Sequence, residues 1–134
     1  MIYNIIMMSI NEFKNDKSSF SSLFATLFEA RDFAHVAHLK SKSFSEHKAL
    51  NDFYESILDL ADSFYETYAG QYGQINFTVT SSKQENVLSY FEDIAKKCHD
   101  FHSAIDKKDT HLHNILDEVT ALVYRTIYKL KFLK

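Results

Sequence analysis

The chain contains no proline and only two glycines, Gly70 and Gly73, and this scarcity limits its fold more than any other feature of the sequence. A β-sheet protein needs many tight turns, and proline and glycine are the residues that such turns favour. Both glycines lie near the middle of the chain. The sequence therefore predicts an all-α protein made of long helices with one main break in the middle.

Four segments show the period of an amphipathic helix, because apolar residues recur in them every three or four positions. The apolar series lie within residues 20–34, 50–68, 87–101 and 112–130. We expect the third helix to run from about Gln84 to Ile105 and the fourth from about Thr110 to Phe132, with Asp109 or Thr110 as its N-cap. A chain of 134 residues is long enough for one domain. The interpretation is a single four-helix-bundle domain over residues 17–134 after an N-terminal extension over residues 1–16.

The connections between the predicted helices differ in length. Residues 40–44 and 106–109 form short polar joints, which place consecutive helices antiparallel. Residues 70–82, by contrast, reach about 40 Å when extended, against about 36 Å for a helix of 24 residues. The second and third helices can therefore be parallel, as in a ferritin-like four-helix bundle. Since Ile75, Phe77 and Val79 alternate with polar residues, a short β-strand is the alternative for this connection.

Charge and composition argue against several classes of partner. A net charge of −3 disfavours a general attraction to DNA or to acidic membranes. No stretch reaches the roughly 18 apolar residues of a membrane span, and the apolar residues 1–10 lack the basic region and cleavage site of a signal peptide. We expect residues before Met8 to be an upstream extension, with Met8 as the more natural start. The single cysteine, Cys98, suits a reducing compartment, so we expect a cytoplasmic protein, in the host cytoplasm if the chain is viral.

The second predicted helix has two distinct faces. Successive residues advance about 100° around a helix axis, which gathers Leu50, Phe53, Ile57, Leu60, Phe64 and Tyr68 on one side. Polar residues gather roughly 150° away on the same wheel; these are His47, Asn51, Glu55, Asp62 and Glu66. The polar face therefore points away from the subunit's own core.

The carboxylate and histidine pattern excludes one kind of metal site. Di-iron sites inside a helical bundle use Glu-x-x-His pairs that project inward, and this chain contains no Glu-x-x-His. On the first helix His38 falls in the sector of Phe20 and Leu27. It is therefore either a metal ligand or a partly buried, hydrogen-bonded histidine that closes the helical hairpin.

The spacing of these polar residues resembles a motif of the Dps-like mini-ferritins. That family carries His-Trp-x-x-Lys-Gly, a turn, a second histidine, and then carboxylates four, fifteen and nineteen residues further on. Here His38-Leu-Lys-Ser-Lys42-Ser is similar to the first part, and Asp62 and Glu66 stand fifteen and nineteen residues after His47. The resemblance covers most of residues 18–134, and residues 33–38 and 47–54 are closer still to small ferritin-like proteins of tailed phages.

The resemblance implies a metal site shared by two subunits. His38 and His47 would come from one copy and Asp62 and Glu66 from its partner, with Asn51 at the position of the first family carboxylate. Imidazole and carboxylate ligands suit Fe²⁺, and also Zn²⁺ or Mn²⁺. The implied protein is a homo-oligomer, a dimer or a larger assembly such as the family's twelve-subunit cages, with oxidation of Fe²⁺ as the reaction.

Three departures from the family keep a second function open. Asn51 replaces a carboxylate, Leu39 replaces the tryptophan, and the turn between the histidines is three residues shorter. The alternative is a non-enzymatic phage helical bundle that binds a host factor or a small ligand, for example in counter-defence. DNA binding and membrane binding are not expected under either hypothesis.

The remaining histidines, cysteine and tyrosines are interpreted as structural. Cys98 and His102, four residues apart, are a candidate zinc pair, but a core cysteine and a surface histidine are favoured. His111 and His113 are predicted on the surface. Two lysine pairs, Lys96–Lys97 and Lys107–Lys108, are taken as solvated ends of the third helix, and Tyr65, Tyr68 and Tyr72 as packing aromatics.

Overall fold

The computed structural model of the chain describes residues 15–134, which form a bundle of four α-helices without any strand. The helices are α2 (Lys17–Lys40), α3 (Phe44–Tyr72), α4 (Val87–His102) and α5 (Thr110–Phe132). The all-α prediction is confirmed for this part of the chain, and the predicted bounds of α5 match. The predicted extension over residues 1–16 lies outside the described residues except for Asn15 and Asp16.

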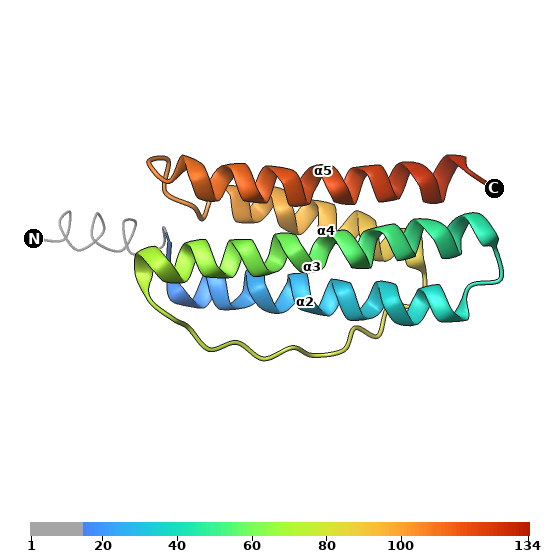
Figure 1. The fold of residues 1–134 in the computed structure, drawn as a ribbon, viewed down its shortest axis with the longest axis horizontal. Helices are drawn as coiled ribbons and strands as arrows, with labels where there is room; N and C mark the ends of the chain where they lie inside the picture. Colours follow the sequence, from blue (N-terminus) through green and yellow to red (C-terminus); the bar gives the residue numbers. More distant parts are fainter. Residues whose placement is uncertain (1–14) are drawn as a thin grey trace, which may run out of the picture.

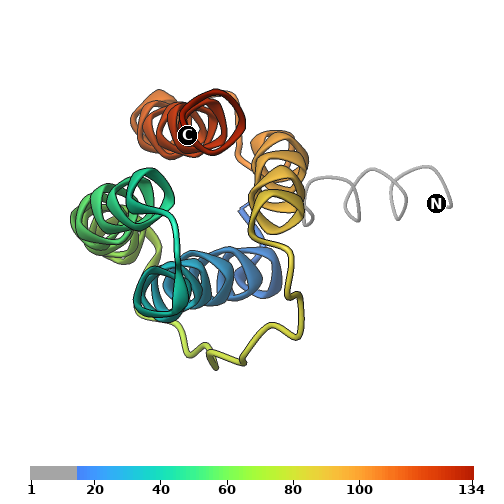
Figure 2. The same ribbon diagram turned by 90° about the vertical axis from the view of Figure 1, so that its right-hand side faces the viewer.

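The helices are arranged so that each is antiparallel to its neighbours. Figure 1 shows α2 and α5 running in one direction along the bundle and α3 and α4 in the other. In the end-on view of Figure 2 the helices occupy the corners of a square, with α3 diagonally opposite α4. The predicted parallel orientation of these two helices is therefore present, and residues 73–86, here called the crossover segment, run the length of the bundle to connect them (Figure 1).

Polar side chains fix where three of the helices begin. Asp16 accepts a hydrogen bond from the amide of Ser18 at 3.3 Å, Ser43 from Glu46 at 3.3 Å, and Asn86 from Ser89 at 2.9 Å. Each satisfies a backbone N–H that has no partner within the helix. The cap at Asn86 explains why α4 begins at Val87 rather than at the predicted Gln84.

Aromatic side chains fill the core between the helices. The Phe20 and Tyr68 rings stack at 4.1 Å, and Phe53 meets Phe91 edge-on at 4.8 Å. The residues predicted for the inner face of α3 are buried apart from the half-buried Leu60. Tyr68 packs as predicted, and its pKa is raised by burial and by the negative charge of Asp16.

The crossover segment packs tightly only in its first half. Ile75 and Phe77 are half-buried, and the Phe77 ring stacks on Phe28 at 5.5 Å. The Tyr65 hydroxyl donates to the Ile75 carbonyl at 3.1 Å. From residue 78 to residue 86 every side chain is exposed. Gly73, which ends α3, has a φ of 94°, a conformation that favours glycine.

No helix within residues 15–134 is both long enough and apolar enough to cross a membrane.

Candidate functional site

The hairpin between α2 and α3 brings the two predicted histidine ligands into direct contact. His38 lies in the last turn of α2, and His47 lies in the first turn of α3 beyond the short joint of residues 41–43. Their rings stack with centroids 3.6 Å apart and planes 20° apart. His38 is 9% exposed and His47 is half-buried, so the pair closes this end of the hairpin.

Each histidine also binds the backbone of the other. The Nδ1 atom of His38 lies 2.7 Å from the His47 carbonyl oxygen, and the Nδ1 atom of His47 lies 2.8 Å from the His38 carbonyl oxygen. A carbonyl oxygen only accepts, so both Nδ1 atoms carry the proton and donate. In the neutral rings Nε2 is then the nitrogen with a free lone pair, and neither Nε2 is hydrogen-bonded to a described residue.

Two residues outside the predicted ligand set, His35 and Tyr54, complete this cluster. The Tyr54 ring stacks on His35 at 4.3 Å and meets His38 edge-on at 5.3 Å. The Tyr54 hydroxyl donates to the Oδ1 atom of Asn51 at 2.8 Å. His35 lies one turn before His38, and Tyr54 lies two turns after His47, so helical spacing alone was a usable signal for both.

The two predicted acidic ligands lie far from the histidines within one chain. Asp62 and Glu66 are exposed on α3, as the helical wheel predicted. Asp62 lies fifteen residues after His47, which is about 22 Å along a helix. Within residues 15–134 no group of three or more histidine, cysteine or acidic side chains is positioned to hold a metal ion. Within one chain the predicted histidine ligands and the predicted acidic ligands therefore lie at two separate places.

A second polar cluster joins α3 to α5 at the opposite end of the bundle. Asp109 stands at the predicted N-cap of α5, but its carboxylate makes no capping bond. Instead it accepts hydrogen bonds from the Tyr72 hydroxyl, from Asn15 at 2.7 Å and from Gln71 at 2.9 Å. Burial raises the pKa of Asp109, but these hydrogen bonds outweigh burial and hold it below its ordinary value.

Most of the other histidines and the cysteine lie where the sequence predicted them, with the cysteine in the core and the histidines on the surface. Cys98 is buried, and burial raises the pKa of its thiol, while a hydrogen bond with Thr120 lowers it in part. His102 is exposed and lies 3.6 Å from Asp117. The prediction that His113 lies on the surface is wrong: the residue is half-buried, and its Nδ1 atom is buried without a hydrogen-bond partner. The His113 ring lies 4.4 Å from the ring of His102.

The lysine pair predicted at the end of the third helix also needs a correction. Lys107 and Lys108 are exposed, but α4 already ends at His102, so they lie in the loop before α5. Lys96 and Lys97 are exposed within α4.

Comparison with known proteins matches this chain to a protein family and to a phage protein. Residues 38–130 match the model of a "Family of unknown function (DUF5856)". The chain is also 24% identical over 104 residues to an "Uncharacterized 14.6 kDa protein in mobD-ri intergenic region" of Enterobacteria phage T4, a match that covers 78% of this chain and 81% of the phage protein. No solved structure matches the chain.

Proposed function

The chain belongs to DUF5856, a family of unknown function, and we propose that it is a mini-ferritin-like homo-oligomer whose copies hold a divalent metal ion between them. The ion is iron, or else zinc or manganese. His38 and His47 of one copy provide imidazoles, and Asp62 and Glu66 of the other provide carboxylates.

The observation that carries this proposal is the hydrogen bonding of the stacked histidines. Metal-binding histidines commonly donate the N–H of their second nitrogen to a carbonyl or a carboxylate, which fixes the tautomer and the ring orientation. His38 and His47 both donate from Nδ1 to a backbone carbonyl. Each Nε2 is therefore in the chemical state that a metal requires.

The position of the acidic residues on α3 supports a shared site. Asp62 and Glu66 are exposed on the outer face, where a second copy can reach them. A two-fold axis near the middle of α3 would pair the His47 end of one helix with the Asp62 and Glu66 end of the other, and would create two equal sites. The antiparallel neighbours and the long crossover segment (Figure 1) are also compatible with a ferritin-like topology.

The ligand set fits a divalent ion. Two carboxylates balance the charge of M²⁺, and mixed imidazole and carboxylate ligands suit Fe²⁺, Zn²⁺ and Mn²⁺. Asn51 adds no charge, and its Oδ1 atom already accepts the Tyr54 hydroxyl. With iron as the substrate, the activity would be oxidation of Fe²⁺ to Fe³⁺ by dioxygen or peroxide.

Native mass spectrometry together with an Fe²⁺ oxidation assay tests this proposal. We expect dimers or larger assemblies that bind metal, and we expect Glu66→Gln to weaken binding by about tenfold or more. Glu118→Gln, which neutralises an exposed carboxylate on α5, is the matched control and should behave as the wild type. A monomeric protein without bound metal, or equal binding by all three proteins, would refute the proposal.

The second candidate is a non-enzymatic phage protein that binds a host factor or a small ligand in the host cytoplasm. The similarity to a phage T4 protein favours it, as does a cavity of about 310 Å³ between α2 and α4. Thermal melting distinguishes the two candidates. Stabilisation by Zn²⁺ or Mn²⁺ that Glu66→Gln abolishes supports the metal site, and indifference to metal supports the second candidate.

A further inference from the structure

The C-terminal half of α5 exposes a row of aromatic side chains. Tyr124, Tyr128 and Phe132 lie four residues apart, which places them in one line along the helix. They are 48%, 56% and 68% exposed. From its first to its last residue the row is about 12 Å long. Single exposed apolar side chains are common on protein surfaces, whereas a continuous group of them indicates an interaction surface.

The start of α3 extends this row at one end of the bundle. Figure 1 shows the C-terminal end of α5 and the α2–α3 hairpin at the same end of the molecule. The Ser45 hydroxyl donates to the Leu133 carbonyl at 3.3 Å, which brings the start of α3 against the end of α5. Of the eight large apolar side chains exposed within residues 15–134, five therefore form one area, here called the α5 surface. They are Phe44, Tyr124, Tyr128, Phe132 and Leu133.

Cations flank the α5 surface. Residues 119–134 contain Arg125, Lys129, Lys131 and Lys134 but no aspartate or glutamate. On the helical wheel Arg125 falls on one side of the aromatic row and Lys131 on the other. Among these four cations only Lys129 forms an ion pair with a described residue, Asp52, at 3.4 Å. Since the whole chain has a net charge of −3, this surface has the opposite sign to the molecule as a whole.

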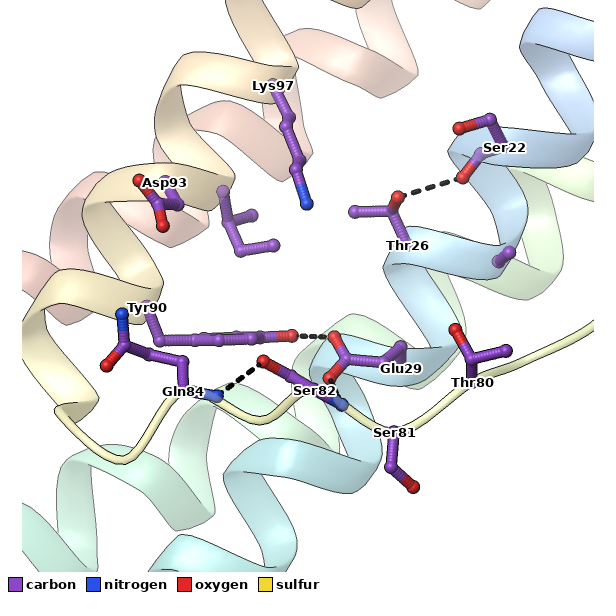
Figure 3. A pocket seen from close by; sticks show the side chains of 12 residues that line it. Ser22, Thr26, Glu29, Thr80, Ser81, Ser82, Gln84, Tyr90, Asp93 and Lys97 are labelled. Carbon is purple, nitrogen blue, oxygen red and sulfur yellow. Dashed lines mark hydrogen bonds between the residues drawn. The ribbon is translucent and has the colours of Figure 1, made fainter.

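Two neighbouring sides of the bundle do not share this excess of cations. The cavity between α2 and α4 is lined by two carboxylates, Glu29 and Asp93, and by the single cation Lys97 (Figure 3). On the α4 side of α5, Glu92 and Lys96 balance each other. The positive charge is therefore a local property of the α5 surface.

The chemistry of the α5 surface complements an acidic amphipathic helix. Carboxylates on such a helix can pair with Arg125 and Lys131 on the two sides of the aromatic row. Its apolar side chains, repeated every three or four positions, can pack against Tyr128 and Phe132. The Tyr128 hydroxyl can also donate to a carboxylate. Charge and apolar area therefore match the same partner.

The rings and the shape of this surface favour a polypeptide over nucleic acid or lipid. The Tyr128 and Phe132 rings lie 5.6 Å apart with their planes 40° apart. They lean on each other and do not offer parallel faces on which successive bases stack. The surface also continues from the side of α5 to the end of the bundle at Phe44 (Figure 1). A flat lipid surface cannot contact the side and the end together.

A second copy of this chain can supply the charge but not the apolar side chains. The outer face of α3 exposes Asp59, Asp62 and Glu66. Apart from Phe44, however, no large apolar side chain of α3 is exposed. Packing of that face on the aromatic row would leave the rings without apolar cover. The partner that fits is therefore a different protein.

We propose that the α5 surface binds an acidic amphipathic helix of another protein, which lies along α5. Arg125 and Lys131 pair with carboxylates on its two edges, and Tyr128 and Phe132 pack against its apolar side chains. The proposal rests on the second candidate function, because it names the chemistry of the host factor. It uses none of the residues predicted to bind metal.

Fluorescence anisotropy of the full chain tests this surface with a labelled peptide of about 18 residues that has leucine at every third or fourth position and glutamate or alanine elsewhere. We expect a dissociation constant between about 1 and 100 µM, which rises with salt. The double variant Tyr128→Ala, Phe132→Ala should weaken binding by about tenfold or more, and so should Lys131→Glu. Val79→Ala and Lys107→Glu, exposed on the crossover segment and in the loop before α5, are the matched controls and should bind as the wild type.

Further probes separate the proposed partner from other occupants. The same peptide with glutamine in place of glutamate should bind about tenfold more weakly or not at all. Oligodeoxythymidine and vesicles of phosphatidylglycerol and phosphatidylcholine should bind more weakly than the acidic peptide. Melting curves of all variants establish that they are folded, and sedimentation shows whether any variant changes self-association.

Four results would overturn the proposal. The first is the absence of peptide binding up to about 1 mM. The second is equal loss of binding in Lys131→Glu and Lys107→Glu, which would indicate a general charge effect. The third is tighter binding of oligodeoxythymidine or of the vesicles, and the fourth is loss of self-association in the Tyr128→Ala, Phe132→Ala variant, which would assign the surface to a second copy. A host protein retained equally by the wild type and this variant would refute the α5 surface but keep the second candidate function.

Discussion

The hydroxyl of Tyr72, at the end of α3, donates a hydrogen bond to the carboxylate of Asp109, at the start of α5. Asn15 and Gln71 donate to the same carboxylate, and the Oδ1 atom of Asn15 accepts the backbone amide of Asp106 at 3.0 Å. The chain entering α2, the end of α3 and the loop before α5 therefore meet at one buried acidic group. Removal of that group should loosen three elements together.

Asp109→Asn should reduce the free energy of unfolding by about 1–3 kcal/mol at neutral pH, because it removes a charged acceptor from a buried network. The hydrogen bonds hold the pKa of Asp109 below its ordinary value. The stabilisation is therefore complete above about pH 4 and is lost as the pH falls through the folded pKa. Urea unfolding between about pH 3 and 7 measures this, and the variant should lose less stability than the wild type on the acid side. The exposed Asp100→Asn is the control, and an equal effect in both variants would contradict the role of the network.

The raised pKa of Tyr72 predicts how the stability of the protein changes at alkaline pH. Burial, followed by the hydrogen bond to Asp109, raises the pKa of Tyr72 to about 12. In the unfolded chain a tyrosine loses its proton near pH 10. The stabilisation is therefore complete below about pH 10 and is lost as the pH rises towards the folded value. Tyr72→Phe should show a shallower fall in stability over this range than the exposed Tyr128→Phe. Identical slopes in the two variants would rule out a special role for Tyr72.

Truncation to alanine should lower the stability of the protein strongly at one phenylalanine of α3 and hardly at all at another. Phe64 is fully buried and contacts the Phe20 and Phe24 rings, whereas Phe44 is 80% exposed. Phe64→Ala should cost about 3–5 kcal/mol through lost burial and a residual cavity, and Phe44→Ala should change stability by less than about 0.5 kcal/mol. Urea unfolding of the two variants measures both values. A large loss in Phe44→Ala would indicate that a second copy covers this residue.

Residues such as Phe64 explain how much of the fold could be predicted from the sequence. Local periodicity determines which side of a helix is apolar, so the core face of α3 and the exposure of Asp62 and Glu66 were predicted correctly. The length of the connection between α3 and α4 allowed the parallel arrangement of these helices. Both arguments need only distances along the chain.

Contacts between remote residues could not be predicted in the same way. The Asp109 network joins residues that are up to 94 positions apart, and Glu29 meets a tyrosine 61 positions away. A helical wheel gives the direction of a side chain but not the partner that packing brings to it. Of the two predicted N-cap residues, Asp109 and Thr110, Asp109 is the one that precedes α5, but its carboxylate makes no capping hydrogen bond. The interpretation of His38 as a hydrogen-bonded histidine that closes the hairpin agrees with the structure, but its partner, the backbone of His47, was not predicted for the same reason.

Cys98 should be unreactive in the folded protein. Its side chain is buried, and burial, opposed in part by the hydrogen bond with Thr120, raises the pKa of the thiol. Because a thiol reagent needs both access and the thiolate, modification at pH 8 should be slower than in urea by a factor of about a thousand or more. A Ser103→Cys, Cys98→Ala variant, with its thiol at an exposed position, should react rapidly and serves as the control. Fast labelling of native Cys98 would mean that α4 opens readily.

A double-mutant cycle on the stacked pair of His38 and His47 can show whether these histidines only stabilise the hairpin or also bind a metal ion. Each ring donates to the backbone of the other, so either single change to alanine breaks the stacking and one of the two hydrogen bonds. We expect each single variant to lose about 1–2 kcal/mol. The double variant should lose less than the sum, with a coupling energy of at least about 0.5 kcal/mol.

The same cycle, measured once with EDTA and once with Zn²⁺, reports on the metal. If the histidines only stabilise the hairpin, the coupling energy should be the same in both conditions, because the stacking and the hydrogen bonds from Nδ1 to the carbonyl oxygens do not involve an ion. Two Nε2 ligands of a shared ion instead give a larger coupling energy with Zn²⁺, because loss of either imidazole releases the metal and its contribution to stability. The comparison should show this increase only at protein concentrations where two copies associate, because Asp62 and Glu66 lie too far along α3 to complete the site within one chain.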